Sequence, residues 1–352
     1  MTFLEKHAVS LQAFSLFSRQ LGARPDYVQG GGGNTSVKLD DHLMAIKASG
    51  YCLEDIRPDK AYAVTDYAAL RRFYTENEPV HFSDVEAAGA AVSKAAQQAI
   101  DGLDALRPSV EAGFHSLLDA YVGHTHSVYA NLAACCKEAQ QVLSDALKGA
   151  DYTSALVPYI NPGAGLTFAI RDVMRQTKAD TGRQPSVLLL QNHGVIVHDD
   201  SDQRCLQIHE DMNGRLARAF RLEQGAFPVP AVKEADDGSF VSHTPWLQSR
   251  LAGDAYPDSL LLDLPLYPDQ MVFFKGTLGE TARIDQKSGI THYHMPRKTA
   301  QTLEETLCAV VFISETIKRQ GLTLVTMGDA AKSFIGGWES EKYRKSLAEG
   351  KA

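Results

Sequence analysis

The chain has 352 residues, of which 44% are hydrophobic, and its formal net charge is −8 at pH 7. This length and composition allow a buried core in one large domain or in a domain with an appendage. The 35 Lys and Arg residues are scattered among 43 Asp and Glu residues, so the charge argues against a broad surface for nucleic acid or an anionic membrane.

Membrane insertion and disulfide bonding are not expected either. The N-terminus lacks the uninterrupted apolar core of a signal peptide, and no run of about 18 apolar residues occurs. Five cysteines without a CxxC spacing are typical of reduced thiols in a cytoplasmic protein. A vicinal disulfide or a metal thiolate at Cys135 and Cys136 is the alternative. We therefore expect a soluble, cytoplasmic protein.

The first elements are a helix and a hairpin. Apolar periodicity predicts a helix over residues 2–21 that stops at Gly22. The glycine-rich segment GGGGNTS, residues 30–36, then leads into two strand-like runs over residues 36–39 and 42–48. Two aspartates join these runs, so we predict a hairpin with the glycines as its entry loop.

Two helices and a strand are predicted next. Ser83 and Glu86 match a capping box that opens an alanine-rich helix ending near Gly102. A second helix begins after Pro108, with Ser109 as its N-cap. Residues 120–124 are typical of a short strand.

The middle of the chain alternates between helices and strands. Ser127 begins a helix that we expect to continue to residue 141, and another helix follows the loop at 161–163. Strands at 187–191 and 195–198 flank a tight turn, Asn192-His193-Gly194. Strands separated mostly by helices favour a layered sheet that is covered on both faces.

The last part of the chain is predicted to contain a long helix, a linker and then short strands. Ser201 caps a long helix that reaches about Leu222. The segment FPVPAVKEADDG, residues 227–238, is predicted to be a linker, and the strands beyond it are short. Thr302 and Glu305 match a capping box for a helix that closes near Gly321.

The sharpest chemical signal is Gly123-His124-Thr125-His126. Residues i and i+2 of a strand face the same side, so His124 and His126 can present two imidazoles to one point. Catalytic zinc takes about three protein ligands and keeps one position open. His193, at the tip of a turn, is the best candidate for the third ligand. The alternative is that HxH is a surface or packing feature and that Asn-His-Gly is merely a good turn sequence.

Glu111 is a candidate acid or base beside that metal. It lies in the predicted first turn of a helix, where the helix dipole favours a carboxylate, and His115 lies on the same helical face. The alternative is a glutamate that only stabilises its helix.

The glycine-rich segment is a candidate anion site. Its glycines, including Gly33, allow backbone N–H groups to approach an anion, and Asn34 and Thr35 add side-chain donors. It is not a nucleotide-binding loop, because it lacks GxxxxGK[ST] and leads into a strand. The segment Lys47-Ala48-Ser49-Gly50 ends the partner strand and can return to the same pocket. A flexible turn is the alternative.

Five segments taken in order resemble the class II aldolase/adducin family: GGGNTSVKL, KASG, RPSVEAGFH, GHTHSV and QNHGVIVHDDS. The resemblance spans residues 30 to about 200. It implies an α/β protein with a three-layer α/β/α fold, which we expect in residues 1–225, while residues 226–352 form a smaller α+β extension (the C-terminal extension) packed on that core. The tail WESEKYRKSL resembles the aldolase part of rhamnulose-phosphate aldolase/lactaldehyde dehydrogenase fusions.

The resemblance also implies roles for the candidate residues. His124, His126 and His193 match the ligands of Zn²⁺ or another divalent metal, and Glu111 matches the catalytic carboxylate. Positions that bind the substrate's phosphate or equivalent anion are matched by Asn34, Ser49, Gly50 and Ser109. Val110 stands where phosphate-using members carry a second hydroxyl, which makes a carboxylate or an unphosphorylated substrate plausible, and Lys47 can compensate in part.

These residues predict a metal-dependent lyase, an aldolase that cleaves a ketose phosphate or a sugar acid through a zinc-stabilised enediolate. A decarboxylase or an epimerase on a related hydroxy-keto acid or sugar phosphate is the alternative, because both pass through the same enediolate. The non-catalytic alternative is an adducin-like binding module, which the retention of three histidines and Glu111 argues against. We expect a small carbonyl substrate, no nucleic-acid or membrane partner, and a homo-oligomer, with the tetramer common in the family.

Overall fold

The computed structural model describes residues 1–223 and 225–337. Its main sheet has eight strands in the order β4 (Gln97–Gln98), β3 (Tyr62–Asp66), β2 (Leu43–Lys47), β1 (Asn34–Lys38), β5 (Tyr121–Thr125), β8 (Gly194–Asp199), β7 (Val187–Leu190) and β6 (Ser154–Val157). Neighbouring strands pair antiparallel except β6 and β7, which are parallel. The hairpin predicted after the glycine-rich segment is therefore confirmed as β1 and β2.

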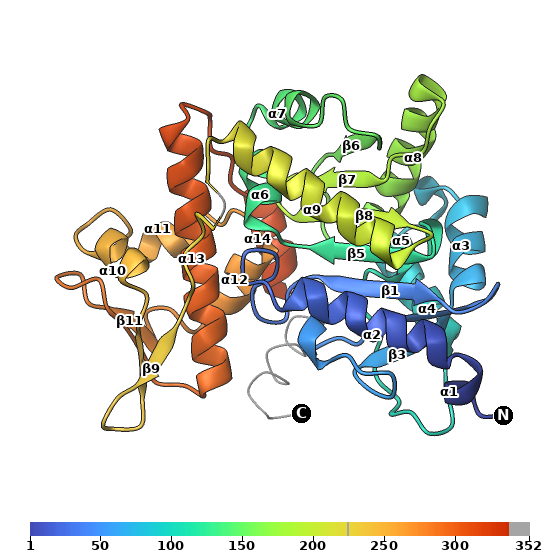
Figure 1. Cartoon of the computed structure of the whole chain (residues 1–352), viewed down its shortest axis with the longest axis horizontal. Helices are drawn as coiled ribbons and strands as arrows, with labels where there is room; N and C mark the ends of the chain where they lie inside the picture. Colours follow the sequence, from blue (N-terminus) through green and yellow to red (C-terminus); the bar gives the residue numbers. More distant parts are fainter. Residues whose placement is uncertain (224, 338–352) are drawn as a thin grey trace.

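Helices cover both faces of this sheet (Figure 1). One face carries α2 (Ala8–Gly22), α6 (Val128–Ala134), α7 (Ala139–Ala146) and α9 (Asp202–Ala219). The other face carries α3 (Tyr67–Glu76), α4 (Val85–Ala96), α5 (Ala112–Leu117) and α8 (Ala164–Thr181). Helix α1 (Phe3–Lys6) precedes α2, so the single helix predicted over residues 2–21 is interrupted at His7. The short helices η1 (Leu53–Asp55) and η2 (Pro79–His81) lie in the connections. The expected three-layer α/β/α fold is confirmed.

Strand β7 shows how the sequence produces these layers. Its four residues are all apolar because both faces of the strand are covered. Val187 and Leu189 pack into the core on the α2, α6 and α9 side, and Leu188 and Leu190 pack into the core under α5 and α8. This period of two is the ordinary alternation of a strand.

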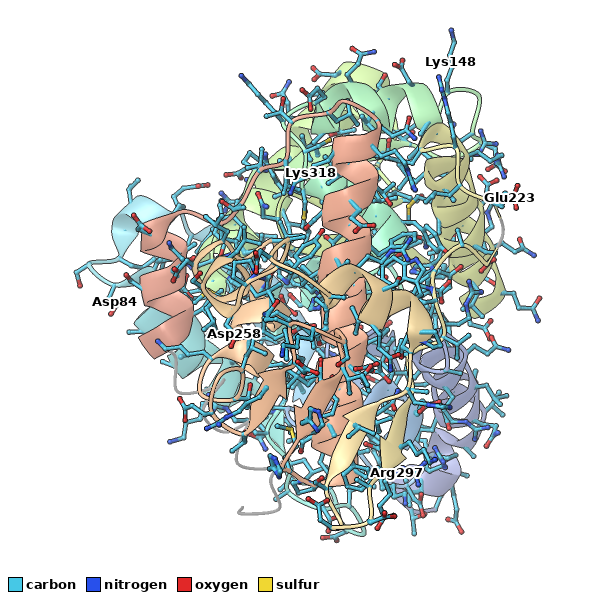
Figure 2. The ribbon with its side chains drawn as sticks, turned by 90° about the vertical axis from the view of Figure 1, so that its left-hand side faces the viewer. Asp84, Lys148, Glu223, Asp258, Arg297 and Lys318 are labelled. Atoms are coloured by element: carbon cyan, nitrogen blue, oxygen red, sulfur yellow. The ribbon has the colours of Figure 1, made fainter. Side chains whose placement is uncertain are left out.

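The C-terminal extension adds a second, four-stranded sheet of order β11 (Ala282–Ile284), β12 (Thr291–Tyr293), β10 (Phe240–Ser242) and β9 (Val232–Glu234). Its helices are α10 (Pro245–Leu251), α11 (Asp258–Asp263), α12 (Pro268–Phe274), α13 (Arg297–Arg319) and α14 (Asp329–Gly337). In Figure 1, α13 stands between the two sheets, and Figure 2 follows it from Arg297 towards Lys318.

Side chains on both sides of the predicted boundary at residue 225 share one hydrophobic core. Tyr129 of α6, for example, contacts Phe312 of α13 edge to face, with ring centroids 6.4 Å apart. The division into two domains at that residue stays a prediction. The predicted likeness of the tail WESEKYRKSL lies outside the described residues. Within the described part of the chain, no helix combines the length and the apolar character that crossing a membrane requires.

Both predicted capping boxes are wrong, because tertiary partners take the glutamates. Helix α4 has Asp84 as its N-cap and ends at Ala96, where the chain pairs with β3 as strand β4. Helix α13 begins at Arg297, five positions before the predicted Thr302. Glu305 accepts a hydrogen bond from the backbone N–H of Gly30 at 2.9 Å instead of capping its own helix.

Three further boundaries differ from the predictions. Ser109 is not an N-cap, since α5 begins at Ala112 with Glu111 at the N-cap position. The single helix expected over 127–141 is broken into α6 and α7, because the backbone at 135–137 pairs with residues 323–325. The predicted linker at 227–238 contains β9 and is part of the second sheet.

Glu86 stabilises a helix other than its own. Its two carboxylate oxygens accept the backbone N–H groups of Ala164 and Gly165, each at 2.8 Å, at the start of α8. The N-cap of α8 is Gly163, which has no side chain to do this. A carboxylate at a helix N-terminus also interacts favourably with the helix dipole.

We expect Glu86→Ala to lower the free energy of unfolding by about 1–3 kcal/mol, because two helix N–H groups lose their acceptors. Chemical denaturation followed by circular dichroism measures the change. Glu76→Ala, at an exposed position in α3, is the control and should change stability by less than about 0.5 kcal/mol. Equal effects in the two variants would contradict the cross-helix cap.

Candidate active site

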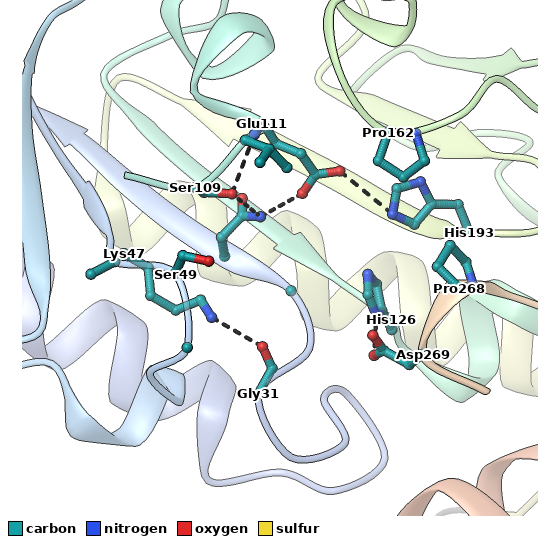
Figure 3. Close-up of a pocket in the computed structure, with 15 residues that line it drawn as sticks. Gly31, Lys47, Ser49, Ser109, Glu111, His126, Pro162, His193, Pro268 and Asp269 are labelled. Atoms are coloured by element: carbon teal, nitrogen blue, oxygen red, sulfur yellow. Dashed lines mark hydrogen bonds and ion pairs between the residues drawn. The ribbon is translucent and has the colours of Figure 1, made fainter. Parts of the chain in front are cut away.

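The three predicted histidines lie together at one end of the main sheet. Their ligand atoms are all within 4.8 Å of one another, and all three residues are buried. His124 and His126 come from the end of β5, and Nε2 of one lies 3.3 Å from Nε2 of the other. His193 reaches the same point from the turn between β7 and β8 (Figure 3).

The local structure of the turn between β7 and β8 explains how His193 is placed beside His124 and His126. Asn192 has a φ of 51°, in the left-handed region that asparagine tolerates better than most residues. Its side-chain amide donates to the backbone carbonyls of Leu266 and Val325, each at 2.9 Å. A Cβ at Gly194 would lie 2.4 Å from the carbonyl oxygen of Thr125, so only glycine lets β8 approach β5 so closely.

Acceptors behind two of the rings orient them. Nδ1 of His124 lies 3.1 Å from the carbonyl oxygen of Val195, which can only accept, so this nitrogen carries the proton. Burial lowers the pKa of His124 to about 4, so the ring is neutral near pH 7. Nδ1 of His126 lies 2.5 Å from Oδ2 of Asp269. In both rings, Nε2 is left facing the centre of the cluster.

Glu111 lies beside the rings as a buried carboxylate. Its Oε2 is 3.6 Å from Nε2 of His124, and its Oε1 is 3.5 Å from Nε2 of His193. Oε2 accepts a hydrogen bond from the amide of Asn34 at 2.6 Å, whereas Oε1 has no hydrogen-bond partner. One oxygen of the carboxylate is thus held by Asn34, and the other is buried beside His193 without a hydrogen-bond partner.

A chain of hydrogen bonds sets the direction of Asn34. Ring nitrogen Nε2 of His115 contacts the amide oxygen of Asn34, and Nδ1 lies 2.7 Å from Oγ of Ser36. Burial holds the pKa of His115 well below its usual value, so the ring is neutral, donates to Asn34 and accepts from Ser36. The Asn34 amide group therefore turns its N–H₂ towards Glu111 and Ser109. The sequence places His115 on the same helical face as Glu111 but does not predict this link through Asn34.

A pocket opens next to the histidines and Glu111. It is lined by Gly31, Gly33, Asn34, Lys47, Ala48, Ser49, Gly50, Ser109, Val110, Glu111, His126, Pro162, His193, Pro268 and Asp269. The predicted anion-binding residues therefore line one wall, with the exception of Thr35. Its hydroxyl lies 2.7 Å from Oγ of Ser18 in α2, so it faces the layer opposite to the pocket.

Lys47 brings a buried positive charge to the same wall. Its Nζ donates to the carbonyl oxygens of Gly31 at 3.0 Å and Tyr51 at 2.7 Å. Gly33 and Gly50 have φ values of 61° and 89°, in the region that favours glycine, so both loops depend on it. This wall is suited chemically to the anionic end of a small molecule.

Pro268 and Asp269 complete the opposite wall, and neither was predicted. They open α12 in the C-terminal extension, more than 140 positions after His126. Proline followed by aspartate is an ordinary helix start. Nothing in that local pattern indicates a partner elsewhere in the chain.

The sequence model of the class II aldolase and adducin N-terminal domain matches residues 15–214, which is more than half of the chain. No curated protein matches the chain. The matched residues include all three histidines and Glu111, whereas Pro268 and Asp269 lie beyond them.

Solved structures give more distant likenesses. The chain is similar to the N-terminal class II aldolase domain of a conserved protein from Thermoplasma acidophilum, with 20% identity and a TM-score of 0.48 over 58% of this chain and 91% of that one. A sugar-phosphate aldolase from Thermotoga maritima matches with 13% identity and a TM-score of 0.43, over 61% and 94% of the two chains. L-fuculose 1-phosphate aldolase from Glaciozyma antarctica matches with 11% identity and a TM-score of 0.41, over 91% and 94%.

Behind the site, Thr125 points from β5 to the opposite face of the sheet. Its hydroxyl lies 2.8 Å from Nε2 of His209 in α9, and the ring of Tyr27 packs against that histidine. Burial lowers the pKa of His209 to about 3. The folded protein therefore keeps this ring neutral over the pH range in which an unfolded chain protonates it.

Stability should consequently fall with acid. The contribution of His209 is fully present above the unfolded pKa of about 6.5 and is lost as the pH drops towards 3. From pH 7 to pH 5 this residue alone should cost about 2 kcal/mol of unfolding free energy. His209→Gln should remove that share of the pH dependence, whereas His292→Gln, at an exposed site in β12, should not. Denaturant titrations at pH 7 and pH 5 measure the unfolding free energy of each variant. If His209→Gln loses as much unfolding free energy between these pH values as the wild type, the role of His209 is refuted.

Proposed function

We propose, on the premise that this chain belongs to the class II aldolase and adducin family, that it is a metal-dependent lyase of the aldolase type. Its substrate in this proposal is a ketose phosphate or a sugar acid, cleaved at the carbon–carbon bond beside a carbonyl. The observation that carries the proposal is the convergence of three buried histidines within 4.8 Å, with a carboxylate alongside.

His124, His126 and His193 fit a divalent cation such as Zn²⁺. In His124 and His126, Nδ1 donates to an acceptor oxygen and Nε2 faces the cluster. Histidines that bind a metal commonly have this arrangement. Three nitrogen donors leave a coordination position for substrate. When bound, the cation acts as a Lewis acid towards the substrate oxygen that gains negative charge during cleavage.

Glu111 has the role of general acid and base. Oε2 is held by the amide of Asn34, so Oε1 has a fixed direction beside His193. From that position the carboxylate can deliver a proton to the substrate carbon left by cleavage, or remove it in the reverse direction. Asn34 and His115 then position the carboxylate and take no part in proton transfer themselves.

The wall of the pocket opposite Pro268 binds the anionic end of the substrate in this proposal. Lys47 supplies the charge, and Ser49 and Ser109 supply hydroxyl donors. Gly33 and Gly50 leave the backbone open to close approach. Val110 lines the pocket with no side-chain donor, so the site admits a carboxylate or an unphosphorylated end as well as a phosphate.

Assembly and location are parts of the same proposal. We expect a homo-oligomer in the cytoplasm. All five cysteines are free thiols, four of them buried, which fits a reducing compartment.

His124→Ala and His126→Ala should each abolish stoichiometric metal binding and activity while the fold survives, because each removes one of three nitrogen donors. Metal content of the purified variants, measured by elemental analysis, and their circular dichroism spectra test this. His292→Ala is the control, since His292 is an exposed residue of the second sheet. The ligand assignment fails if either site variant retains one metal per chain.

Glu111→Gln should keep its metal and lose about 10²–10⁴ in kcat, the usual contribution of a general acid or base. Glutamine preserves the side-chain volume, and its carbonyl oxygen can still accept from Asn34. Steady-state turnover against Glu76→Gln, an exposed glutamate in α3, gives the comparison. Unchanged turnover would remove the role assigned to this carboxylate.

The substrate test is a screen of hydroxy-keto acids and ketose phosphates with the metal-loaded protein. Release of an aldehyde supports the aldolase, whereas release of CO₂ or a change of configuration assigns the same site to a decarboxylase or an epimerase. A purified protein without stoichiometric metal and without turnover would instead indicate an adducin-like binding module.

A further inference from the structure

The C-terminal extension inserts one charged side chain into the candidate active site. Asp269 is the second residue of α12 and has no exposed surface. Figure 3 shows its carboxylate directed at the ring of His126, on the side away from Glu111. A carboxylate buried to this degree is costly unless it is paired, so its position requires a partner.

That partner is the outer nitrogen of a candidate metal ligand. Oδ2 of Asp269 lies 2.5 Å from Nδ1 of His126. A carboxylate can only accept, so Nδ1 carries the proton and Nε2 presents its lone pair to the histidine cluster. His124 is oriented by a neutral backbone carbonyl, so only His126 of these two rings has a charged acceptor behind it. A charged acceptor makes the hydrogen bond stronger and the ring a more basic ligand.

The glycine-rich loop is shaped around this pair. A Cβ at Gly32 would lie 2.2 Å from Oδ2 of Asp269 and 3.0 Å from Nδ1 of His126. The backbone of Gly32 is not in the left-handed region, so space rather than conformation demands glycine there. The loop, the histidine and the aspartate therefore fit together as one unit.

The extension also holds the segments that surround this unit. The hydroxyl of Tyr267, next to α12, donates to the side chain of Gln29 at 3.2 Å. Glu305 of α13 accepts the N–H of Gly30 at 2.9 Å. The carbonyl of Leu266 accepts from Asn192, beside His193, at 2.9 Å. The C-terminal extension thus contacts the glycine-rich segment and the turn that carries His193, both of which contribute residues to the pocket.

We propose that Asp269 is a positioning residue of the metal site, which sets the tautomer and direction of His126. The C-terminal extension is then a working part of the site, although the matched family region ends at residue 214. This inference rests on the proposed function, because it presumes that the histidines bind a metal. It predicts a graded loss of metal affinity when the carboxylate is changed.

The test measures the Kd for Zn²⁺ of the full chain by competition with a chromophoric chelator. Asp269→Ala removes the acceptor and should weaken binding about 10–100-fold, as changes behind a metal ligand usually do. Asp269→Asn keeps the volume and an oxygen that accepts from Nδ1 but loses the charge, so its loss should be smaller. Asp258→Asn, in the first turn of α11 and outside the pocket-lining set, is the matched control and should bind like the wild type.

Two readouts separate positioning from general support of the fold. The absorption spectrum of the Co²⁺-loaded protein should change in Asp269→Ala, because the direction of one imidazole ligand changes. The weak Co²⁺ binding that two histidines retain in His126→Ala, titrated at millimolar Co²⁺, should not weaken further when Asp269→Ala is added, because the effect of Asp269 acts through that ring. Additive losses would assign Asp269 a merely structural role and overturn the inference.

The outcomes distinguish this inference from the function beneath it. A wild type that binds no metal overturns the proposed function. A wild type that binds metal, together with an Asp269→Ala variant of equal affinity and unchanged cobalt spectrum, overturns only the positioning role. If Asp269→Ala does not fold, Asp269→Asn decides, and wild-type affinity in that folded variant would count against the carboxylate.

Discussion

Histidine nitrogens that face a common point from inside a protein must be held neutral and pointed inwards. Burial favours the neutral ring, and an acceptor behind the ring decides which nitrogen keeps its lone pair. In this protein Nδ1 of His124 donates to the backbone carbonyl of Val195, and Nδ1 of His126 donates to the carboxylate of Asp269. The rest of the structure is arranged so that these acceptors, the rings and Glu111 meet in one place.

The main sheet supplies the first part of that arrangement. The antiparallel pairing of β5 with β8 sets His124 opposite Ile196 and Thr125 opposite Val195, which places the turn with His193 beside the end of β5. Pairing of β1 with β5 sets Asn34 opposite His124 and so brings the amide within reach of Glu111. Strand register therefore determines the distances between groups that lie far apart in the sequence.

The C-terminal extension supplies the second part. A loop of consecutive glycines has few side chains to hold it, and glycine loses more conformational freedom on ordering than other residues. Contacts from Glu305 and Tyr267 hold this loop. Asp269 belongs to the same C-terminal extension. The extension therefore both holds the glycine-rich segment and provides the acceptor for Nδ1 of His126. Substitutions in the C-terminal extension are therefore expected to change the positions of the glycine-rich segment and of His126 in the site.

The sequence by itself determined the elements whose causes are local. The i,i+2 spacing of His124 and His126, the turn around His193, the hairpin after the glycines and the apolar run of β7 follow from strand periodicity and turn chemistry. Tertiary structure decided the remainder. Glu86 and Glu305 match capping boxes, yet each accepts from backbone N–H groups elsewhere in the chain. Thr35, by contrast, faces away from the pocket for a local reason, because it follows Asn34 in a strand. Asp269 shows the same limit most clearly, because a hydrogen bond between residues 143 positions apart depends on packing and leaves no periodic trace in the sequence.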